Sequence, residues 1–428
     1  MISLAFLFPA HAETKLSLND CINIALKNQP AMKAALAGIA SGKGREMQAV
    51  APYLPQVTTS TGYSDSRQIG GSFGGESFTR SYTTSLSVNQ TLYDFGRTGN
   101  ALDAARFGTL SNEFDSDRVK QDVILNVKQS YFALLQAKKL VTVSQKTLEQ
   151  TTSHLKQATA FFHAGSKPRF DVTRAEVEVN SARLSLINAN NTMRIRTIAM
   201  YNAMGIEPGG VLEIDDSLSV STVMPPYEQT KEGALKNRPE MRKIEADIDA
   251  ARARVKAAEA GYLPTLSATG TYNWVHGQSQ TGPFYGDLQD SWNAGITLSL
   301  PLFEGGLTRG RVSEARANLL VVEAQRETLQ QSILIELSQA YADMESAKVR
   351  IDVMDSSLQK AQENLSIAKG RYDAGVGPYI EVTDAQVASV NAETDYVQAL
   401  YDYQLAAARL MKAIGAVDYI PNPKDDSK

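Results

Sequence analysis

Histidine and cysteine, two residue types that often carry enzyme chemistry, are few and scattered in this chain of 428 residues. No HExxH, GxSxG or P-loop motif occurs, and the histidines show no metal-ligand spacing. The four histidines are His11, His154, His163 and His276. The one cysteine, Cys21 in LNDCINIAL, fits the apolar side of an amphipathic helix better than a lipidated or reactive thiol. We therefore expect no enzyme, no cofactor and no metal site.

A repeated phrase is the most informative feature of the sequence. AGSKPRFDVTRAEV begins at Ala164, and AGVGPYIEVTDAQV begins at Ala374, 210 residues later. Other pairs recur at 209 or 210 residues: LKNQP and LKNRP, YLPQVTTSTGY and YLPTLSATGTY, LYDFG and LFEGG. Self-similarity at one fixed spacing indicates a tandem duplication. We expect a first repeat over 13–210, a linker over 211–227, a second repeat over 228–415 and a tail over 416–428.

The first residues and the net charge limit the location and the partners. MISLAFLFPAHA is apolar and ends in a small-x-small pattern, which predicts a signal peptide over 1–12 whose basic start is missing. After it, no run of 18 uncharged apolar residues occurs that would form a membrane-spanning helix. The net charge of −4 gives no basic surface for nucleic acid. These features favour an exported protein that does not bind nucleic acid.

Two long segments have helical periodicity. Residues 97–163 and 307–373 contain no proline, and their apolar residues recur in steps of three and four. Each segment has 67 residues and would form a helix of roughly 100 Å, which must pack sideways against other helices. Shorter helices are expected over about 18–50 and 228–260 before each hairpin of strands, and again after each repeated turn. Each repeat is therefore expected to form a long antiparallel helical hairpin.

Four segments alternate like strands and lack charge. They lie in 56–64, 81–93, 265–281 and 291–303, although 21% of the chain is charged. One side of each is apolar, with aromatic residues towards the ends, as in transmembrane barrels; the alternative is the edge of an ordinary β-sandwich. Four strands cannot close a barrel, and lipid tolerates no open edge, so three copies sharing twelve strands are expected. The apolar residues expected to face lipid are Leu86, Val88, Ile296 and Leu298.

These motifs, in this order, resemble the TolC family of outer-membrane efflux proteins from about Leu16 to Gly415. The resemblance implies a mainly α fold with a small β part. Long helical hairpins and four barrel strands per chain would trimerise into a twelve-stranded β-barrel and a twelve-helix α-barrel tunnel. It implies the outer membrane of a Gram-negative bacterium, with a long periplasmic extension. It also implies outer-membrane lipid, a periplasmic adaptor and an inner-membrane pump or ABC exporter as partners.

The resemblance also implies roles for the repeated turns. They would be the tips that face the inner membrane, where the adaptor binds. The expected tip contacts are Gly165, Ser166, Lys167, Gly375, Val376 and Gly377, and the three glycines suit left-handed turn positions.

Within the same turns, the resemblance places a constriction ringed by acids. Glu381 and Asp384 match its acidic positions, and Asp171 matches Glu381 in the first copy. Arg174 stands opposite Asp384, and we expect it to pair with Asp384 or Asp171. Tyr372 matches a lock tyrosine. Gly377 replaces the lock arginine, for which Lys167 and Arg169 are possible substitutes.

The function expected from all these features is the exit duct of a tripartite efflux pump or a type I secretion system. It would conduct substrates passively from an inner-membrane transporter to the exterior. The alternative is a soluble periplasmic coiled-coil scaffold or an adaptor-like protein. Nothing in the sequence identifies the exported substrate.

Overall fold

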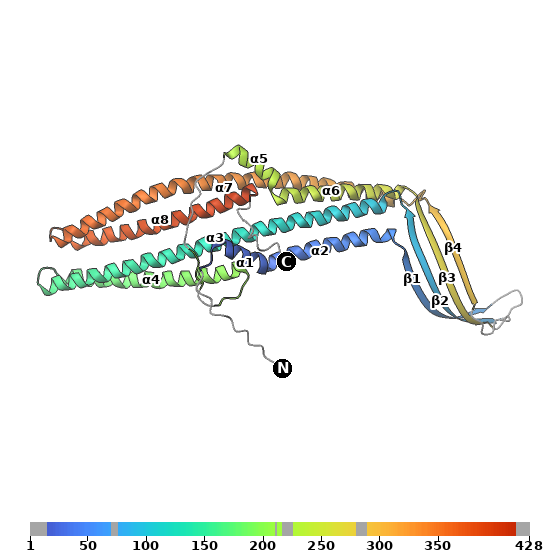
Figure 1. Ribbon diagram of the computed structural model, residues 1–428, viewed down its shortest axis with the longest axis horizontal. Helices are drawn as coiled ribbons and strands as arrows, with labels where there is room; N and C mark the ends of the chain where they lie inside the picture. The colour runs from blue at the N-terminus through green and yellow to red at the C-terminus, as the bar shows by residue number, and fades with distance from the viewer. Residues whose placement is uncertain (1–14, 70–75, 210–211, 216–225, 280–288, 417–428) are drawn as a thin grey trace. The chain divides into compact units, whose positions relative to one another are not determined.

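The computed structural model describes residues 15–69, 76–209, 212–215, 226–279 and 289–416. The predicted signal peptide over 1–12, most of the predicted linker and residues 417–428 of the tail lie outside these ranges. Figure 1 labels the elements. The first half contains α1 (Leu18–Asn28), α2 (Pro30–Val50), β1 (Gln56–Ile69), β2 (Glu76–Tyr93), α3 (Arg97–His163) and α4 (Arg169–Met204). The second contains α5 (Tyr227–Asn237), α6 (Pro239–Glu259), β3 (Thr265–Ser279), β4 (Gln289–Ser299), α7 (Leu307–Asp373) and α8 (Tyr379–Ile414).

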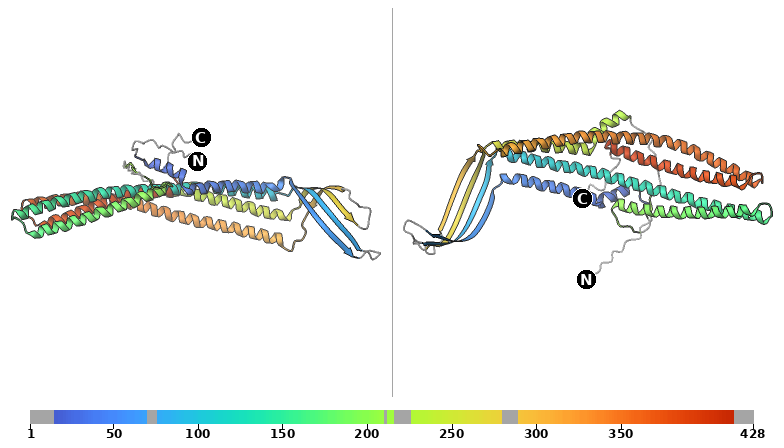
Figure 2. Two further views of the ribbon diagram at one scale, coloured as in Figure 1. Left: turned by 90° about the horizontal axis from the view of Figure 1, so that it is seen from below. Right: turned by 180° about the vertical axis from the view of Figure 1, so that it is seen from behind.

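The two longest helices begin and end at the residues that periodicity predicts. Helices α3 and α7 have 67 residues each. Each is followed by a short turn and then by a partner helix of 36 residues, α4 or α8. In all views α3 runs beside α4, and α7 beside α8 (Figures 1 and 2). The helical hairpins expected from the sequence are thus confirmed.

The prediction of one continuous helix before each pair of strands is wrong. The segment 18–50 divides into α1 and α2, and the segment 228–260 divides into α5 and α6. The breaks fall at Gln29, with ψ 126°, and at Arg238, with ψ 130°. Each of these residues precedes a proline, whose ring disfavours the helical conformation of the residue before it. The repeated LKNQP and LKNRP motifs are therefore two copies of one helix break.

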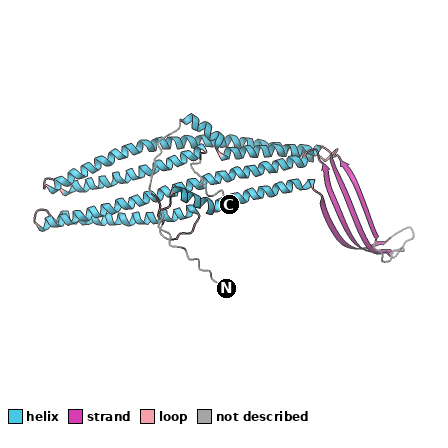
Figure 3. Cartoon of the chain, in the orientation of Figure 1, coloured by secondary structure: helices cyan, strands magenta, loops and turns pink. Residues whose placement is uncertain are grey.

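The strands, drawn in magenta in Figure 3, form one antiparallel sheet in the order β1-β2-β3-β4, as labelled in Figure 1. Its register pairs Tyr63 with Tyr82, Leu86 with Tyr272, and Tyr272 with Trp292. Because directly paired residues share a face and neighbours alternate, large apolar residues collect on one face. We call it the apolar face; serine, threonine and asparagine occupy the opposite, polar face.

The described residues belong to two compact units. One comprises the described parts of Met1–Leu36, Asp115–Met241 and Leu329–Lys428, and the other comprises Ala37–Phe114 and Arg242–Thr328. The second unit contains the sheet and the helical segments adjoining it. There, α2 approaches α3 closely at Gly42, where an added Cβ would lie 2.8 Å from the hydroxyl oxygen of Thr109.

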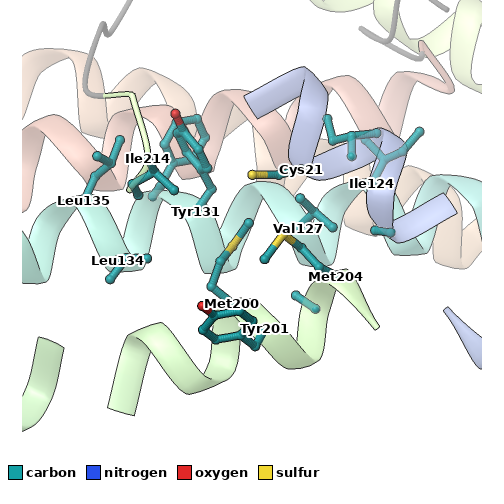
Figure 4. Packing of buried hydrophobic residues seen from close by; sticks show 14 of the residues in the cluster. Cys21, Ile124, Val127, Tyr131, Leu134, Leu135, Met200, Tyr201, Met204 and Ile214 are labelled. Carbon is teal, nitrogen blue, oxygen red and sulfur yellow. The ribbon is translucent and has the colours of Figure 1, made fainter. Parts of the chain in front are cut away.

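The first unit contains a core built around α1. Figure 4 shows Cys21 between side chains of α3 and α4, including Val127, Met200 and Met204. Cys21 is fully buried, and this burial, with Asp20 beside it, raises the pKa of its thiol to about 12. The expectation that Cys21 occupies an apolar position on a helix is confirmed.

A second cluster in this unit joins α5, α7 and α8 around Ile333, Leu337 and Tyr403. No helix among the described residues is long and apolar enough to cross a membrane.

Candidate functional site

The turn between α3 and α4 and the turn between α7 and α8 are the tips predicted from the sequence. Gly165 and Gly375 have φ of 72° and 75°, as expected for left-handed turn residues. In both tips the amide after this glycine donates back to a helix carbonyl: Ser166 to Phe161 and Val376 to Arg371, each at 3.0 Å. These bonds satisfy carbonyls that the helix end would leave free. The same backbone turn is therefore made twice.

Gly377 does not have the predicted left-handed conformation, since its φ is not positive. Glycine is required at this position because neighbouring side chains approach it closely. An added Cβ would lie 3.1 Å from Cβ of Arg371 and 3.2 Å from Oε2 of Glu381. A side chain at this position would press on the ion pair between Arg371 Nε and Glu381 Oε2, which are 3.1 Å apart.

Tyr372 lies at the centre of an aromatic cluster at the tips. Its ring contacts those of Phe161, at 5.9 Å between centroids, and Tyr379, at 5.3 Å. Lys167 Nζ lies 4.8 Å from its ring centroid, in cation–π geometry. Burial, with the Asp171 carboxylate nearby, raises the pKa of Tyr372 to about 12. The structure thus brings three of the predicted tip residues, Tyr372, Lys167 and Asp171, into one cluster.

The predicted acids differ in their surroundings. Asp171 is buried, with 8% of its surface exposed, whereas Glu381 and Asp384 are exposed. Glu381 has Arg371 as its partner. The Arg174 guanidinium lies 3.8 Å from Glu178 on the same helix, rather than in the expected pair with Asp384 or Asp171. Residues four apart on one helix are neighbours on its surface, which makes this pair readily available to the half-buried Arg174.

Glu178 is a tip residue that sequence reasoning missed. Its Oε2 accepts a hydrogen bond from the hydroxyl of Tyr379 at 2.9 Å, and its Oε1 accepts one from Thr383 at 2.8 Å. Both donors lie on α8, whereas Glu178 lies on α4. Burial and the adjacent Glu178 carboxylate raise the pKa of Tyr379. One carboxylate therefore joins the two helical hairpins.

Further polar contacts join the same hairpins, one of them at the end of α7 and one farther from the turn. Gln386 donates to Gln150 at 2.9 Å, and Gln157 donates to Asp373 at 2.6 Å. Each of these bonds has an uncharged amide as donor. These directional bonds can hold the two hairpins in register, and the bond to the Asp373 carboxylate is the stronger of the two.

The sheet places the four predicted lipid-facing residues together. Leu86 and Val88 of β2 share the apolar face with Ile296 and Leu298 of β4, because the register through β3 keeps all four at equivalent positions. All four are exposed in the single chain. Within the described residues, no cluster of three histidine, cysteine, aspartate or glutamate side chains has a geometry that would hold a metal ion.

Comparison with known proteins supports one family over most of the chain. The family model described as outer membrane efflux protein matches residues 21–206 and 232–416. Outer membrane protein TolC of Escherichia coli (strain K12) is 24% identical over 393 residues, which cover 87% of this chain and 76% of that protein. Alkaline protease secretion protein AprF of Pseudomonas aeruginosa is 24% identical over 422 residues, with 94% and 85% covered.

Solved structures share the fold. A crystal structure of CusC superposes with a TM-score of 0.82 at 21% identity, over 94% of this chain and 92% of CusC. The Campylobacter jejuni CmeC outer membrane channel gives a TM-score of 0.81 at 19% identity, over 93% and 85%. The long helical hairpins and the strands match those of such channels, as the resemblance implied. The chain belongs to the family of outer membrane efflux proteins.

Proposed function

We propose that this chain is the exit duct of a tripartite efflux pump or a type I secretion system, conducting substrates passively across the outer membrane. The observation that carries the proposal is that one chain has both a two-faced sheet and long helical hairpins. The family is one of channel proteins rather than enzymes. The match of this chain to the family favours the duct over the alternative of a soluble scaffold or an adaptor-like protein.

Three copies are proposed to build the duct. The sheet of one chain ends in β1 on one side and β4 on the other, and both edges carry backbone groups without a strand partner among the described residues. Lipid does not tolerate such edges, so β4 of one copy would pair with β1 of the next. Three sheets of four strands then close a twelve-stranded barrel. A mass measurement in mild detergent tests this; a monomer or dimer with intact strands would refute the trimer.

The apolar face is proposed to contact lipid. Leu86→Arg or Ile296→Arg would then place a charge near the middle of the bilayer, at a cost of roughly 2 to 4 kcal/mol, and prevent outer-membrane assembly. Ser87→Arg and Thr297→Arg are matched controls, because each neighbours a test residue but lies on the polar face. Membrane fractionation should detect loss of the first pair of variants and retention of the second. The opposite outcome would mean that the faces are inverted.

The tips are proposed to meet a periplasmic adaptor that connects the duct to an inner-membrane pump or ABC exporter. Of the predicted contacts, Gly165, Ser166, Gly375 and Val376 are exposed, Lys167 is half-buried and Gly377 is buried, so the exposed four are the accessible candidates. Cysteine crosslinking from Ser166 and Val376 in intact cells should capture one periplasmic protein. Crosslinks formed equally well from positions on the sheet would show that the tips are not a specific contact.

A further inference from the structure

Glu178 occupies an unusual position among the carboxylates at the tips. It is 19% exposed at its side chain, and both of its oxygens are engaged by hydroxyls of the other hairpin. Tyr379 and Thr383 lie four residues apart on α8, so one turn of that helix presents both donors together. Carboxylate acceptors make stronger hydrogen bonds than neutral ones.

We propose that Glu178, Tyr379 and Thr383 form a tip latch that holds the two hairpins of one chain together. The equivalent residues of the repeat do not form a second latch of this kind. The latch differs from the acids and the tyrosine predicted from the sequence: neither Glu381, Asp384 nor Tyr372 is part of it. Glu178 acts as a positioning residue for the closed tip. It does not contact the transported substrate.

The duplication shows why the latch is one-sided. The position 210 residues after Glu178 is Ala388, and the position 210 residues before Tyr379 is Arg169. Only Thr383 has an equivalent partner, Thr173. The second copy of the unit therefore lacks the carboxylate, and the first copy lacks the phenol. The backbone turn is repeated, but the latch is not.

This asymmetry has a consequence that rests on the proposed trimer. Six hairpins around one axis meet at two alternating kinds of contact, one within a chain and one between neighbouring chains. The latch strengthens the contact within each chain. The contact between chains, where Ala388 and Arg169 stand at the equivalent positions, lacks it. Opening then separates neighbouring chains at their tips, while the two hairpins of each chain move as a pair.

The first test measures the latch within one chain. Spin labels on Ser166→Cys and Val376→Cys report the separation of the two tips, and the buried Cys21 is inaccessible to the label. Glu178→Ala, Tyr379→Phe and Thr383→Val should each broaden the distance distribution towards longer separations. Glu176→Gln is the matched control, because this glutamate is exposed and lies two residues away on the same helix. Distributions like that of the parent in all three latch variants would overturn the proposal.

The second test measures conduction in planar bilayers. With the latch lost, the two hairpins of one chain can also part from each other; removing one hydrogen bond to a charged acceptor should favour this parting roughly tenfold and so raise the open fraction. Tyr379→Phe keeps the aromatic ring, so a rise in that variant separates the lost bond from lost packing. Circular dichroism and the detergent mass establish that each variant is folded and assembled. A trimer that conducts as the parent does in every latch variant refutes the latch alone, whereas a parent that forms no trimer refutes the proposed function.

The third test builds the missing latch. Ala388→Glu together with Arg169→Tyr places a carboxylate and a phenol at the equivalent positions, where Thr173 already supplies the hydroxyl. Conductance of this double variant should fall severalfold, and Ala388→Gln with Arg169→Phe should leave it near the parent value. Equal conductance in the two double variants would overturn the inference that the tips open between chains.

Discussion

The two tips share a backbone turn but not a charge pattern. In the first, Lys167 lies over the ring of Tyr372; in the second, Gly377 stands at the equivalent position and leaves room for Arg371 to pair with Glu381. A glycine with positive φ is retained in both tips, because other residues adopt that conformation at a cost. The comparison teaches that duplication preserved what the backbone requires, whereas the side chains diverged into contacts that occur once per chain.

The two helix breaks also differ in their side-chain contacts, and we expect substitutions there to have the largest effect on stability. Arg238 is 4% exposed and pairs with Glu240 at 3.0 Å and Glu336 at 2.6 Å. At the matching break Gln29 donates to the carbonyls of Asn202 and Ala203 instead. Arg238→Met should cost about 3 kcal/mol, because it leaves the carboxylate of Glu240, which is only 15% exposed at its side chain, without its partner. Gln29→Met should cost about 1 kcal/mol. Denaturant midpoints in detergent measure both, and equal losses would contradict the distinction.

Each copy of the repeat has a glycine with positive φ at its tip and another at the end of the following helix, and the two should differ in how well they tolerate alanine. Gly205 and Gly415 end α4 and α8 with φ of 68° and 75°, and an added Cβ would meet the backbone nitrogen of the helix break at 2.9 Å and 3.0 Å. Alanine at either should cost roughly 2 to 3 kcal/mol, from backbone strain and overpacking. Gly165→Ala and Gly375→Ala have open space around them and should cost roughly 1 kcal/mol. Melting temperatures that do not fall into these two groups would argue against the close approach.

The ion pair at one break predicts a dependence on pH that the other break lacks. Burial opposes ionisation of Glu240, but the hydrogen bonds and charge of Arg238 outweigh it and hold its pKa below the ordinary 4.5. A depressed carboxyl pKa stabilises the folded state above the unfolded-state value and loses that contribution as the pH falls through the folded-state value. Stability should therefore decline below about pH 4.5. Thermal melts of Arg238→Met should decline less over the same range, whereas those of Gln29→Met should follow the parent.

The acids of the second tip give the smallest expected effect. Exposed carboxylates around a proposed threefold axis would attract cations, multivalent ones most strongly. Because Arg371 offsets the charge of Glu381, Asp384→Asn should reduce cation selectivity and block by trivalent cations severalfold more than Glu381→Gln. Bilayer recordings with the trivalent ion added on the periplasmic side measure both. Block that persists in the double variant would place the constriction elsewhere.

Local patterns predicted the fold from the sequence almost completely. The limits of α3 and α7 follow from a proline-free helical period, and the alternation in β2 and β4 gave the correct faces of the sheet. The helix breaks at Gln29 and Arg238 were missed, although the following prolines were visible, because apolar periodicity on both sides was given more weight than the restriction before proline.

The tips were less predictable, because their contacts join residues far apart in the chain. Glu178 and Tyr379 are 201 residues apart, and nothing in the local sequence of either indicates the other. The replacement of Glu178 by Ala388 in the second copy was the available signal, since a charge present in only one of two repeated units points to a contact made once. Arg174 was paired incorrectly because Glu178, one turn away, was not considered.

The polar face of the sheet carries many hydroxyls, and two pairs of them lie within hydrogen-bonding distance of each other across β1 and β2. Ser60 lies 2.7 Å from Ser85, and Ser64 lies 2.7 Å from Ser81, oxygen to oxygen. A hydroxyl that already has a neighbour for its proton offers little to a passing solute, and the face has no charge along these strands to retain one. Fast passage requires that a wall hold its contents only weakly. In the proposed duct, a wall built this way would give short residence times for solutes of very different chemistry, and would leave the choice of cargo to the proteins proposed to load it.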